Sequence, residues 1–242
     1  AFAAPLRSAS TIAKRGPSAA MVANLDPRGL NQRELETLLH EFGHELNMVL
    51  SRVNYAPQAL STVKWDFVEA PSQMFEEWAR RPEALALFKQ VCPQCPALSA
   101  DEVRKLEEAR RYGQASGVAR QWLLGAFDMS LSMNPRPPLE AWKELESATP
   151  LGYVEGTTFP TAFRHIAANY AAGYYSYMWA RVIASDLLTP FGGNLMDPKV
   201  GARYRATILG VGTQDEESLM VRRFLGRDPS SKPFFADITG KG

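Results

Sequence analysis

The stretch Leu39-His40-Glu41-Phe42-Gly43-His44 places two histidines four residues apart and a glutamate directly after the first. Asn31 and Glu34 precede it as a capping pair, whose side chains can accept hydrogen bonds from free backbone N–H groups at a helix start. Apolar residues recur around the motif at three- and four-residue steps, which predicts one apolar helix face formed by Leu35, Leu38, Leu39, Phe42, Leu46, Val49 and Leu50. We therefore expect a helix that begins after Asn31 and contains the whole motif.

On such a helix His40 and His44 lie one turn apart on the same face, so both imidazoles can bind one metal ion. Glu41 lies about a third of a turn from His40, close enough to hold a water molecule beside the metal without binding the metal itself. The alternative is a core helix with two incidental histidines. Since the chain has only 3 histidines, two of which form this pair, the metal-binding interpretation is preferred.

Length and composition indicate an ordinary globular protein. The chain has 242 residues, of which 45% are hydrophobic and 22% charged, enough for one large domain or two small ones. The net charge of +1 creates no strong field for nucleic acid or an anionic membrane, and no apolar run approaches the length of a membrane span. We therefore expect neither nucleic acid nor a membrane as a partner.

A second helical segment is expected from Trp65 to Trp78. Glu69 lies in its apolar stretch, where a carboxylate is costly unless it is paired or binds a metal. A third protein ligand on a separate helix is what a catalytic zinc site requires. The alternative is a carboxylate at a helix N-terminus, stabilised by the helix dipole, with Pro71 marking the first turn. The two upstream histidines favour the ligand interpretation.

The segment from Phe159 to Tyr177 contains the third histidine, His165, and several of the chain's 8 tyrosines. Tyr174 and Tyr177 are three residues apart, so on a helix both hydroxyls would point the same way. Tyrosine hydroxyls and an imidazole can stabilise the oxyanion of a tetrahedral intermediate. The alternative is an aromatic core helix, because the apolar pattern continues as far as Ile183. From this segment alone both interpretations remain open.

The sequence Cys92-Pro93-Gln94-Cys95 is a C-x-x-C pair. A zinc ribbon requires a second such pair, and a thioredoxin-like site requires a βαβ setting, whereas the surroundings are expected to be helical. We therefore expect a turn between helices, with a thiol redox module as the minor alternative. Towards the end of the chain, Glu216 to Leu225 is expected to form the last helix.

The first 25 residues are basic and rich in Ser and Ala, with no acid before Asp26, as in organellar transit peptides. However, the sequence from Ala20 to Leu25 predicts a short buried strand that leads into the metal-binding helix. We therefore expect these residues to be an internal piece of a longer protein.

Three blocks occur in a characteristic order: His-Glu-Phe-Gly-His at 40–44, Asp-Phe-Val-Glu-Ala-Pro-Ser-Gln-Met at 66–74, and His165 followed by Tyr-Tyr-Ser-Tyr at 174–177. In these blocks the chain resembles the C-terminal part of the thimet oligopeptidase and oligopeptidase A family of zinc metallopeptidases. The resemblance implies a mainly α fold, a multi-helical zincin-type metallopeptidase catalytic domain with an HExxH active-site helix. Residues 1–242 would form the C-terminal catalytic portion, without the N-terminal part of the family fold.

The resemblance also implies roles for particular residues. The implied ligands of one Zn²⁺ ion per chain are His40, His44 and Glu69. Glu41 would be the general base on a zinc-bound water. The remaining implied site residues, which contact substrate or stabilise the transition state, are His165, Tyr170, Tyr174 and Tyr177. Among them the histidine is expected in catalysis, the first tyrosine in substrate binding, and the other two tyrosines in both.

These features together predict a zinc-dependent metalloendopeptidase that hydrolyses short, unstructured peptides. We expect a monomer located in the cytoplasm or in an organelle (a mitochondrion or plastid) rather than a secreted protein. A missing N-terminal segment, which in the family walls the substrate channel, is expected as a further partner. The alternative is an inactive truncated remnant that acts as a non-catalytic helical domain.

Overall fold

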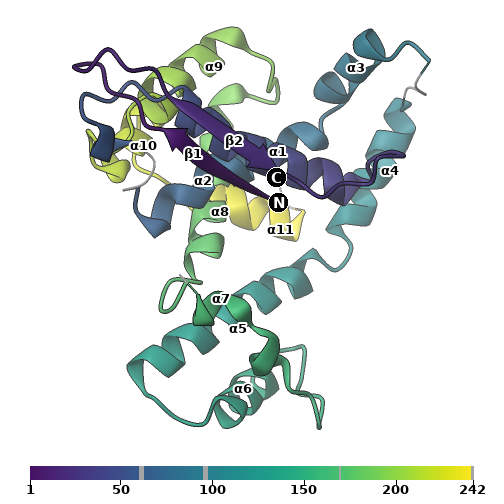
Figure 1. The fold of residues 1–242 in the computed structure, drawn as a ribbon. Coiled ribbons are helices and arrows are strands. Elements are labelled where there is room, and N and C mark those ends of the chain that lie inside the picture. Colours follow the sequence, from purple (N-terminus) through teal and green to yellow (C-terminus); the bar gives the residue numbers. More distant parts are fainter. Residues whose placement is uncertain (60–62, 95–97, 169, 241–242) are drawn as a thin grey trace.

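The computed structural model describes residues 1–59, 63–94, 98–168 and 170–240 (Figure 1). These residues are mainly helical, as the sequence predicts, and the part that is described contains one two-stranded sheet. Figure 1 shows an upper body around α1, Gln32–Val49, and a lower lobe around α6, Pro138–Ser147. Among the helices described, none is long and apolar enough to cross a membrane.

The HExxH motif lies in α1, which begins directly after Asn31 as expected. The Asn31 side chain accepts a hydrogen bond from the Glu34 N–H at 3.0 Å, and the Glu34 carboxylate accepts one from the Asn31 N–H at 2.9 Å. This capping box satisfies two backbone donors that the helix itself leaves without partners. The predicted start of the metal-binding helix is therefore confirmed, together with its cause.

Strands β1, Phe2–Arg7, and β2, Ser18–Val22, form an antiparallel hairpin that contacts α1. The strand expected from Ala20 to Leu25 exists, but it begins earlier and ends at Val22. Its residues are half-buried or exposed, so the expectation of a buried strand is wrong. The reason is that a two-stranded sheet beside a single helix has little covering it on its other face.

Helix α2, Trp65–Phe75, lies against α1 and α8, Ser176–Leu187, and continues into the 3₁₀ turn η3, Glu76–Ala79. Pro71 lies inside α2, not in its first turn, so the alternative for Glu69 as a helix N-terminal carboxylate is wrong. The main hydrophobic core forms around these helices, and its largest fully buried side chains are Met74, Leu187, Ile208, Met220 and Phe224. The core thereby fixes α2, which carries Glu69.

Two further helices lead from the body into the lower lobe, namely α4, Ala100–Arg111, and α5, Gln114–Met133. They follow α3, Pro82–Val91. Cys92 ends α3 and its N–H donates to the Phe88 carbonyl at 2.8 Å, whereas Cys95 lies outside the described residues. The expected turn between helices is therefore observed from Cys92 to Gln94, where the described part of this connection ends.

The lower lobe has a core of its own between α5, α6 and the segment 159–174, which includes η4, Phe159–Ala162, and α7, Arg164–Ala167. The buried residues of this core are Leu123, Leu124, Phe127, Ala141, Trp142, Phe163 and Tyr174. The lobe therefore holds the tyrosine-rich segment against α5.

The C-terminal part returns to the upper body. It consists of η5, Thr189–Phe191, α9, Pro198–Tyr204, the π-helical turn η6, Arg205–Leu209, α10, Glu217–Leu225, and α11, Lys232–Thr239. Helix α10 matches the expected last helix, but α11 follows it. The sequence pattern misses α11 because the apolar side chains Phe234, Phe235 and Ile238 span little more than one turn, which is too short to establish a helical period.

Candidate active site

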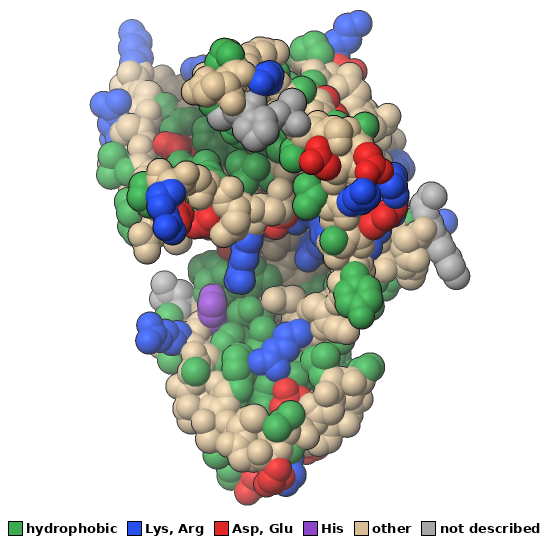
Figure 2. Space-filling model, turned by 90° about the vertical axis from the view of Figure 1, so that its right-hand side faces the viewer, with side chains coloured by type: hydrophobic (Ala, Val, Ile, Leu, Met, Phe, Trp, Pro, Cys, Tyr) green, Lys and Arg blue, Asp and Glu red, His purple; other side chains and the backbone are tan. Residues whose placement is uncertain are grey.

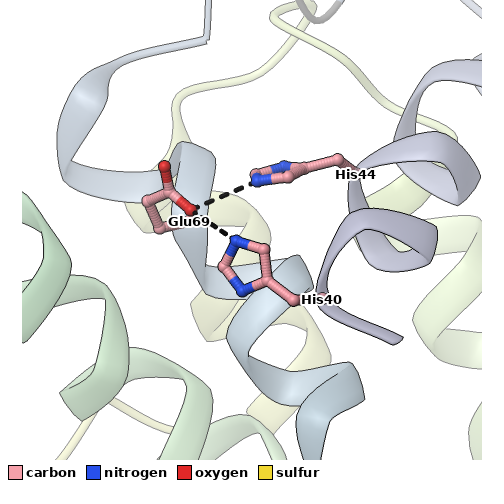
Figure 3. Close-up of side chains that lie close together, drawn as sticks. All are labelled: His40, His44 and Glu69. Carbon is pink, nitrogen blue, oxygen red and sulfur yellow. Dashed lines mark ion pairs between the residues drawn. The ribbon is translucent and has the colours of Figure 1, made fainter. Parts of the chain in front are cut away.

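His40 and His44 project from one face of α1 toward Glu69 on α2 (Figure 3). The Nε2 atom of His40 lies 3.3 Å from Glu69 Oε2, and Nε2 of His44 lies 3.2 Å from the same oxygen. All three ligand atoms lie within 4.8 Å of one another. Glu69 is 4% exposed, so this carboxylate is buried beside two imidazoles.

This donor set fits a zinc ion. Zinc binds imidazole nitrogen and carboxylate oxygen at about 2.0–2.2 Å with tetrahedral geometry, which separates neighbouring ligand atoms by about 3.4 Å. The nitrogen–oxygen distances of 3.3 and 3.2 Å at this site are close to that value. Three protein ligands leave the fourth position for water or substrate, as in catalytic rather than structural zinc sites.

Glu76 in η3 orients one of these histidines. Its Oε1 lies 2.7 Å from His40 Nδ1, so the imidazole can donate there and direct Nε2 toward Glu69. Burial disfavours the charged imidazole, but the hydrogen bonds with Glu69 and Glu76 outweigh it and raise the pKa of His40 to about 10. Burial likewise opposes ionisation of Glu69, yet His40 and His44 hold its pKa well below the usual range. The three groups thus form a strongly coupled polar cluster.

Glu76 is not among the site residues expected from the sequence. A signal was nevertheless present, because Glu76 follows Glu69 by seven residues and so lies two helical turns further along the same face. Whether its side chain reaches His40 depends on how α2 and η3 cross α1, which the spacing alone does not determine.

Gly43 allows α1 and α2 to approach closely. A Cβ atom added at Gly43 would lie 2.6 Å from the Cα of Ser72 and 3.0 Å from the carbonyl oxygen of Pro71. Any side chain at this position would therefore push the helices apart. The glycine inside the motif thus sets the spacing that brings Glu69 within reach of both histidines. Ser72 Oγ also donates to Glu69 Oε2 at 3.2 Å.

Glu41 lies next to His40 on α1 and is 8% exposed. Burial raises the pKa of Tyr177 to about 12, and the negative charges of Glu69 and Glu41 act in the same direction. Tyr177 therefore lies within the electrostatic reach of both carboxylates. Its phenol keeps its proton at neutral pH and is able to donate a hydrogen bond.

Tyr170 touches the candidate metal centre directly. Its hydroxyl donates a hydrogen bond to Glu69 Oε1 at 2.9 Å, on the oxygen that does not face the histidines. Burial and the charge of Glu69 raise the pKa of this hydroxyl above its usual range. The Tyr170 ring stacks on Tyr177 with 5.0 Å between centroids. This residue therefore links the tyrosine segment to a candidate metal ligand.

The structure brings His165 and the three tyrosines into one cluster. The His165 ring centroid lies 5.7 Å from that of Tyr170, 5.3 Å from that of Tyr174 and 6.1 Å from that of Tyr177. Tyr174 and Tyr177 do not share a helix, however, because α8 begins at Ser176. Their ring centroids are still 5.1 Å apart, so the proximity predicted from helical spacing arises from a turn instead.

Figure 2 shows the molecule hollowed between the upper body and the lower lobe, with hydrophobic side chains on the walls of the hollow. The candidate metal ligands belong to α1 and α2 in the body, and the tyrosine cluster belongs to the segment that packs on the lobe. A separate cavity of about 550 Å³ is lined by other residues, among them Phe67, Trp179 and Val221. This cavity is therefore distinct from the candidate site.

Known proteins are similar to this chain over most of its length. The sequence model of Peptidase family M3 matches residues 5–239. Oligopeptidase A of Escherichia coli (strain K12) is 36% identical over 216 residues, which are 85% of this chain and 32% of that relative. Two Arabidopsis thaliana proteins, "Probable cytosolic oligopeptidase A" and "Organellar oligopeptidase A, chloroplastic/mitochondrial", are each 31% identical over 238 residues, or 90% of this chain and 34% and 30% of theirs. The chain thus spans about a third of the length of these relatives.

Proposed function

Because this chain belongs to Peptidase family M3, we propose that it carries the active site of a zinc-dependent oligopeptidase that hydrolyses short peptides. The observation that carries this proposal is the approach of Nε2 of His40 and of His44 to Glu69 Oε2, at 3.3 and 3.2 Å. Two imidazoles and one carboxylate at this spacing are the donor set of a catalytic zinc site. One Zn²⁺ ion per chain would be held there.

A zinc ion at this centre supplies a Lewis acid that makes water more acidic and polarises the scissile carbonyl. Glu41 takes a proton from the attacking water on a carboxylate oxygen and then delivers it to the leaving amine. Its burial beside His40 supports this role, because a fixed carboxylate shielded from bulk water transfers protons over a short, defined path.

The aromatic cluster stabilises the transition state and holds the peptide. Tyr174, Tyr177 and His165 donate hydrogen bonds to the oxyanion that develops on the scissile carbonyl. The raised pKa of Tyr177 supports its role as a donor, since the phenol remains protonated. Tyr170 holds Glu69 and faces the substrate, and Tyr174 and Tyr177 line the same surface. A short peptide in an extended form fits the open cleft between body and lobe.

Residues 1–242 represent, in this proposal, the C-terminal catalytic portion of a longer family fold. The support is that the chain spans about a third of the length of its relatives. A further segment that walls the cleft would then be a partner of this portion, and the active form would be a monomer. The names of the two plant relatives support a location in the cytosol or in an organelle. The alternative is a non-catalytic helical domain.

Cleavage of a short, quenched fluorescent peptide by the zinc-loaded chain tests the proposal. We expect cleavage that a chelator abolishes and added zinc restores. Glu41→Gln should keep one zinc per chain and lower kcat by about a thousandfold or more, because the proton acceptor is lost. His44→Ala should lose both zinc and cleavage.

The matched control is Glu140→Gln, the same chemical change at an exposed position on α6. It should behave like the wild type. Loss of zinc in Glu41→Gln would contradict the assignment of this residue as the base. A wild-type chain that binds zinc in a folded state and cleaves nothing would support the non-catalytic alternative.

A further inference from the structure

A buried carboxylate on α5 holds the turn that precedes α8. Asp128 is 2% exposed. Its Oδ1 accepts a hydrogen bond from the N–H of Ala172, and its Oδ2 accepts one from the N–H of Tyr174, both at 2.9 Å. A buried carboxylate is costly unless its oxygens accept hydrogen bonds, and two backbone donors meet that requirement here. Neither the motifs nor the proposed chemistry assigns a role to this residue.

The turn that Asp128 holds is an unusual one for its sequence. Ala172 adopts a φ of 56°, a left-handed conformation that residues with a Cβ atom avoid. The next residue, Gly173, donates its N–H to the Tyr170 carbonyl at 2.9 Å. The hydrogen bonds from Ala172 and Tyr174 to Asp128 therefore hold the backbone in a conformation that the local sequence alone disfavours.

A second contact from α5 supports the same turn. Gly125 precedes Asp128 by three residues and lies on the same face of the helix. A Cβ atom added at Gly125 would lie 3.2 Å from the Cα of Tyr175, so the glycine permits a close approach. Helix α5 thus contacts the turn in two ways. Asp128 accepts hydrogen bonds from residues 172 and 174, and Gly125 packs against the backbone of residue 175.

We propose that Asp128 is a positioning residue, which fixes the turn 170–175 and so places the tyrosines against the metal centre. The inference rests on the proposed peptidase function. The turn connects Tyr170, whose hydroxyl donates to Glu69 at 2.9 Å, to Tyr174 and the start of α8. If the turn relaxes, the hydroxyl groups move relative to the reacting carbonyl. A misplacement of about 1 Å is able to lower a rate by about a hundredfold.

Asp128→Asn tests this role with little change in size. The new amide group presents N–H donors toward a backbone N–H, so one hydrogen bond is lost and two donors face each other. The matched control is Asp186→Asn on α8. Asp186 is 0% exposed and also accepts a backbone N–H, that of Ser230 at 2.7 Å, but it holds the chain before α11 and pairs in addition with Arg227. Both variants therefore weaken a buried carboxylate, and only one of them contacts the tyrosine turn.

Amide hydrogen exchange of the zinc-loaded full chain measures the turn without any need for activity. In Asp128→Asn we expect exchange at Ala172 and Tyr174 to accelerate about tenfold or more, because a buried hydrogen bond is lost. Zinc content should be unchanged, since α1 and α2 supply the ligands. In Asp186→Asn the same two amides should keep their wild-type exchange rates. Equal exchange at these amides in Asp128→Asn and wild type overturns the proposal.

Peptide cleavage supplies the second measurement. We expect kcat to fall about 10- to 100-fold in Asp128→Asn and to remain near the wild-type value in Asp186→Asn. If the wild-type chain cleaves no peptide, the proposed function fails while the exchange experiment still decides whether Asp128 holds the turn. If Asp128→Asn does not fold, amide exchange in the wild type decides whether Asp128 holds the turn. Ala172 and Tyr174 amides as slow as those of α5 support the role, and fast exchange there overturns it.

Discussion

The candidate metal centre and the tyrosine segment lie side by side, since Tyr170 donates to Glu69, but they are built in opposite ways. The metal centre consists of two regular helices, and the period of α1 alone aligns His40 with His44. The tyrosine segment, 159–177, consists of short helical turns, and its backbone is held by Asp128, which precedes Ala172 by 44 residues. Local pattern is therefore sufficient to align two candidate metal ligands, His40 and His44, whereas the positions of Glu69 and of the tyrosines depend on contacts between distant parts of the chain.

The largest effect on turnover is expected from a change in the tyrosine segment that leaves the candidate metal ligands untouched. Tyr177→Phe keeps the ring stacked on Tyr170 and removes only the hydroxyl. We expect kcat to fall by about 10²- to 10³-fold, the usual cost of losing one oxyanion donor. Zinc affinity should not change, because the ligands are untouched. Steady-state kinetics and zinc titration measure the two effects independently.

The control for this change is Tyr153→Phe, which removes a hydroxyl from the edge of the lobe core. It should retain wild-type turnover. A Tyr177→Phe protein that loses zinc along with turnover would show that the tyrosine segment helps to build the metal centre. The two regions could then no longer be regarded as independently built.

A smaller effect is expected from Gly43→Ala, which tests how the metal centre depends on the approach of its helices. The added methyl carbon would lie 2.6 Å from the Cα of Ser72, so α1 and α2 must move apart. Such overpacking costs about 1–3 kcal/mol of stability. Because Glu69 moves with α2, zinc affinity should fall as well. Thermal unfolding and zinc titration of the purified variant measure both quantities.

Gly117→Ala on α5 is the matched control, since a Cβ atom there meets nothing within 4 Å. Alanine favours a helix over glycine by about 1 kcal/mol, so this variant should be as stable as the wild type or slightly more stable. If Gly43→Ala binds zinc as tightly as the wild type does, the helix spacing is not what positions Glu69.

The contrast between the two regions also explains what could be predicted from the sequence. The start of α1 and the direction of both histidines follow from the Asn31 cap and the helical period, and the structure confirms them. Tyr174 and Tyr177 do not share the helix that the spacing argument assumed, because Tyr174 lies in the turn before α8, where its N–H donates to Asp128. No periodic pattern encodes a contact between residues so far apart in the chain.

The same limit applies within the metal centre. Glu69 could be predicted as a ligand because a carboxylate in an apolar stretch requires a partner. Glu76 lies on the same face as Glu69, but it stands beside a second glutamate, Glu77, and the spacing does not say which of its neighbours it meets. Its contact with His40 became visible only from the crossing of α1 and η3. The roles of Glu41, His165 and the tyrosines in catalysis remain predictions that the kinetic experiments test.

The smallest effect is expected from Glu76→Gln, which tests whether the contact of Glu76 with His40 contributes to the candidate metal centre. Glutamine keeps an oxygen that can accept from His40 Nδ1, but it removes the charge that strengthens this hydrogen bond. Changes to groups that orient a metal ligand cost about 10- to 100-fold in metal affinity, and the retained acceptor places this variant near tenfold. Competitive zinc titration measures the change, and hydrogen exchange of the turn 170–175 should stay as in the wild type.

Glu77→Gln is the control, because Glu77 lies in the same 3₁₀ turn and pairs with Arg80 and Arg81 instead of a histidine. If both variants weaken zinc binding equally, the net charge of η3 acts on the metal centre from a distance. If only Glu76→Gln does so, the effect passes through the orientation of one imidazole. In that case Glu76, which turns the ring of His40, belongs to the candidate metal centre as much as the three candidate ligands do, although no motif in the sequence marks it.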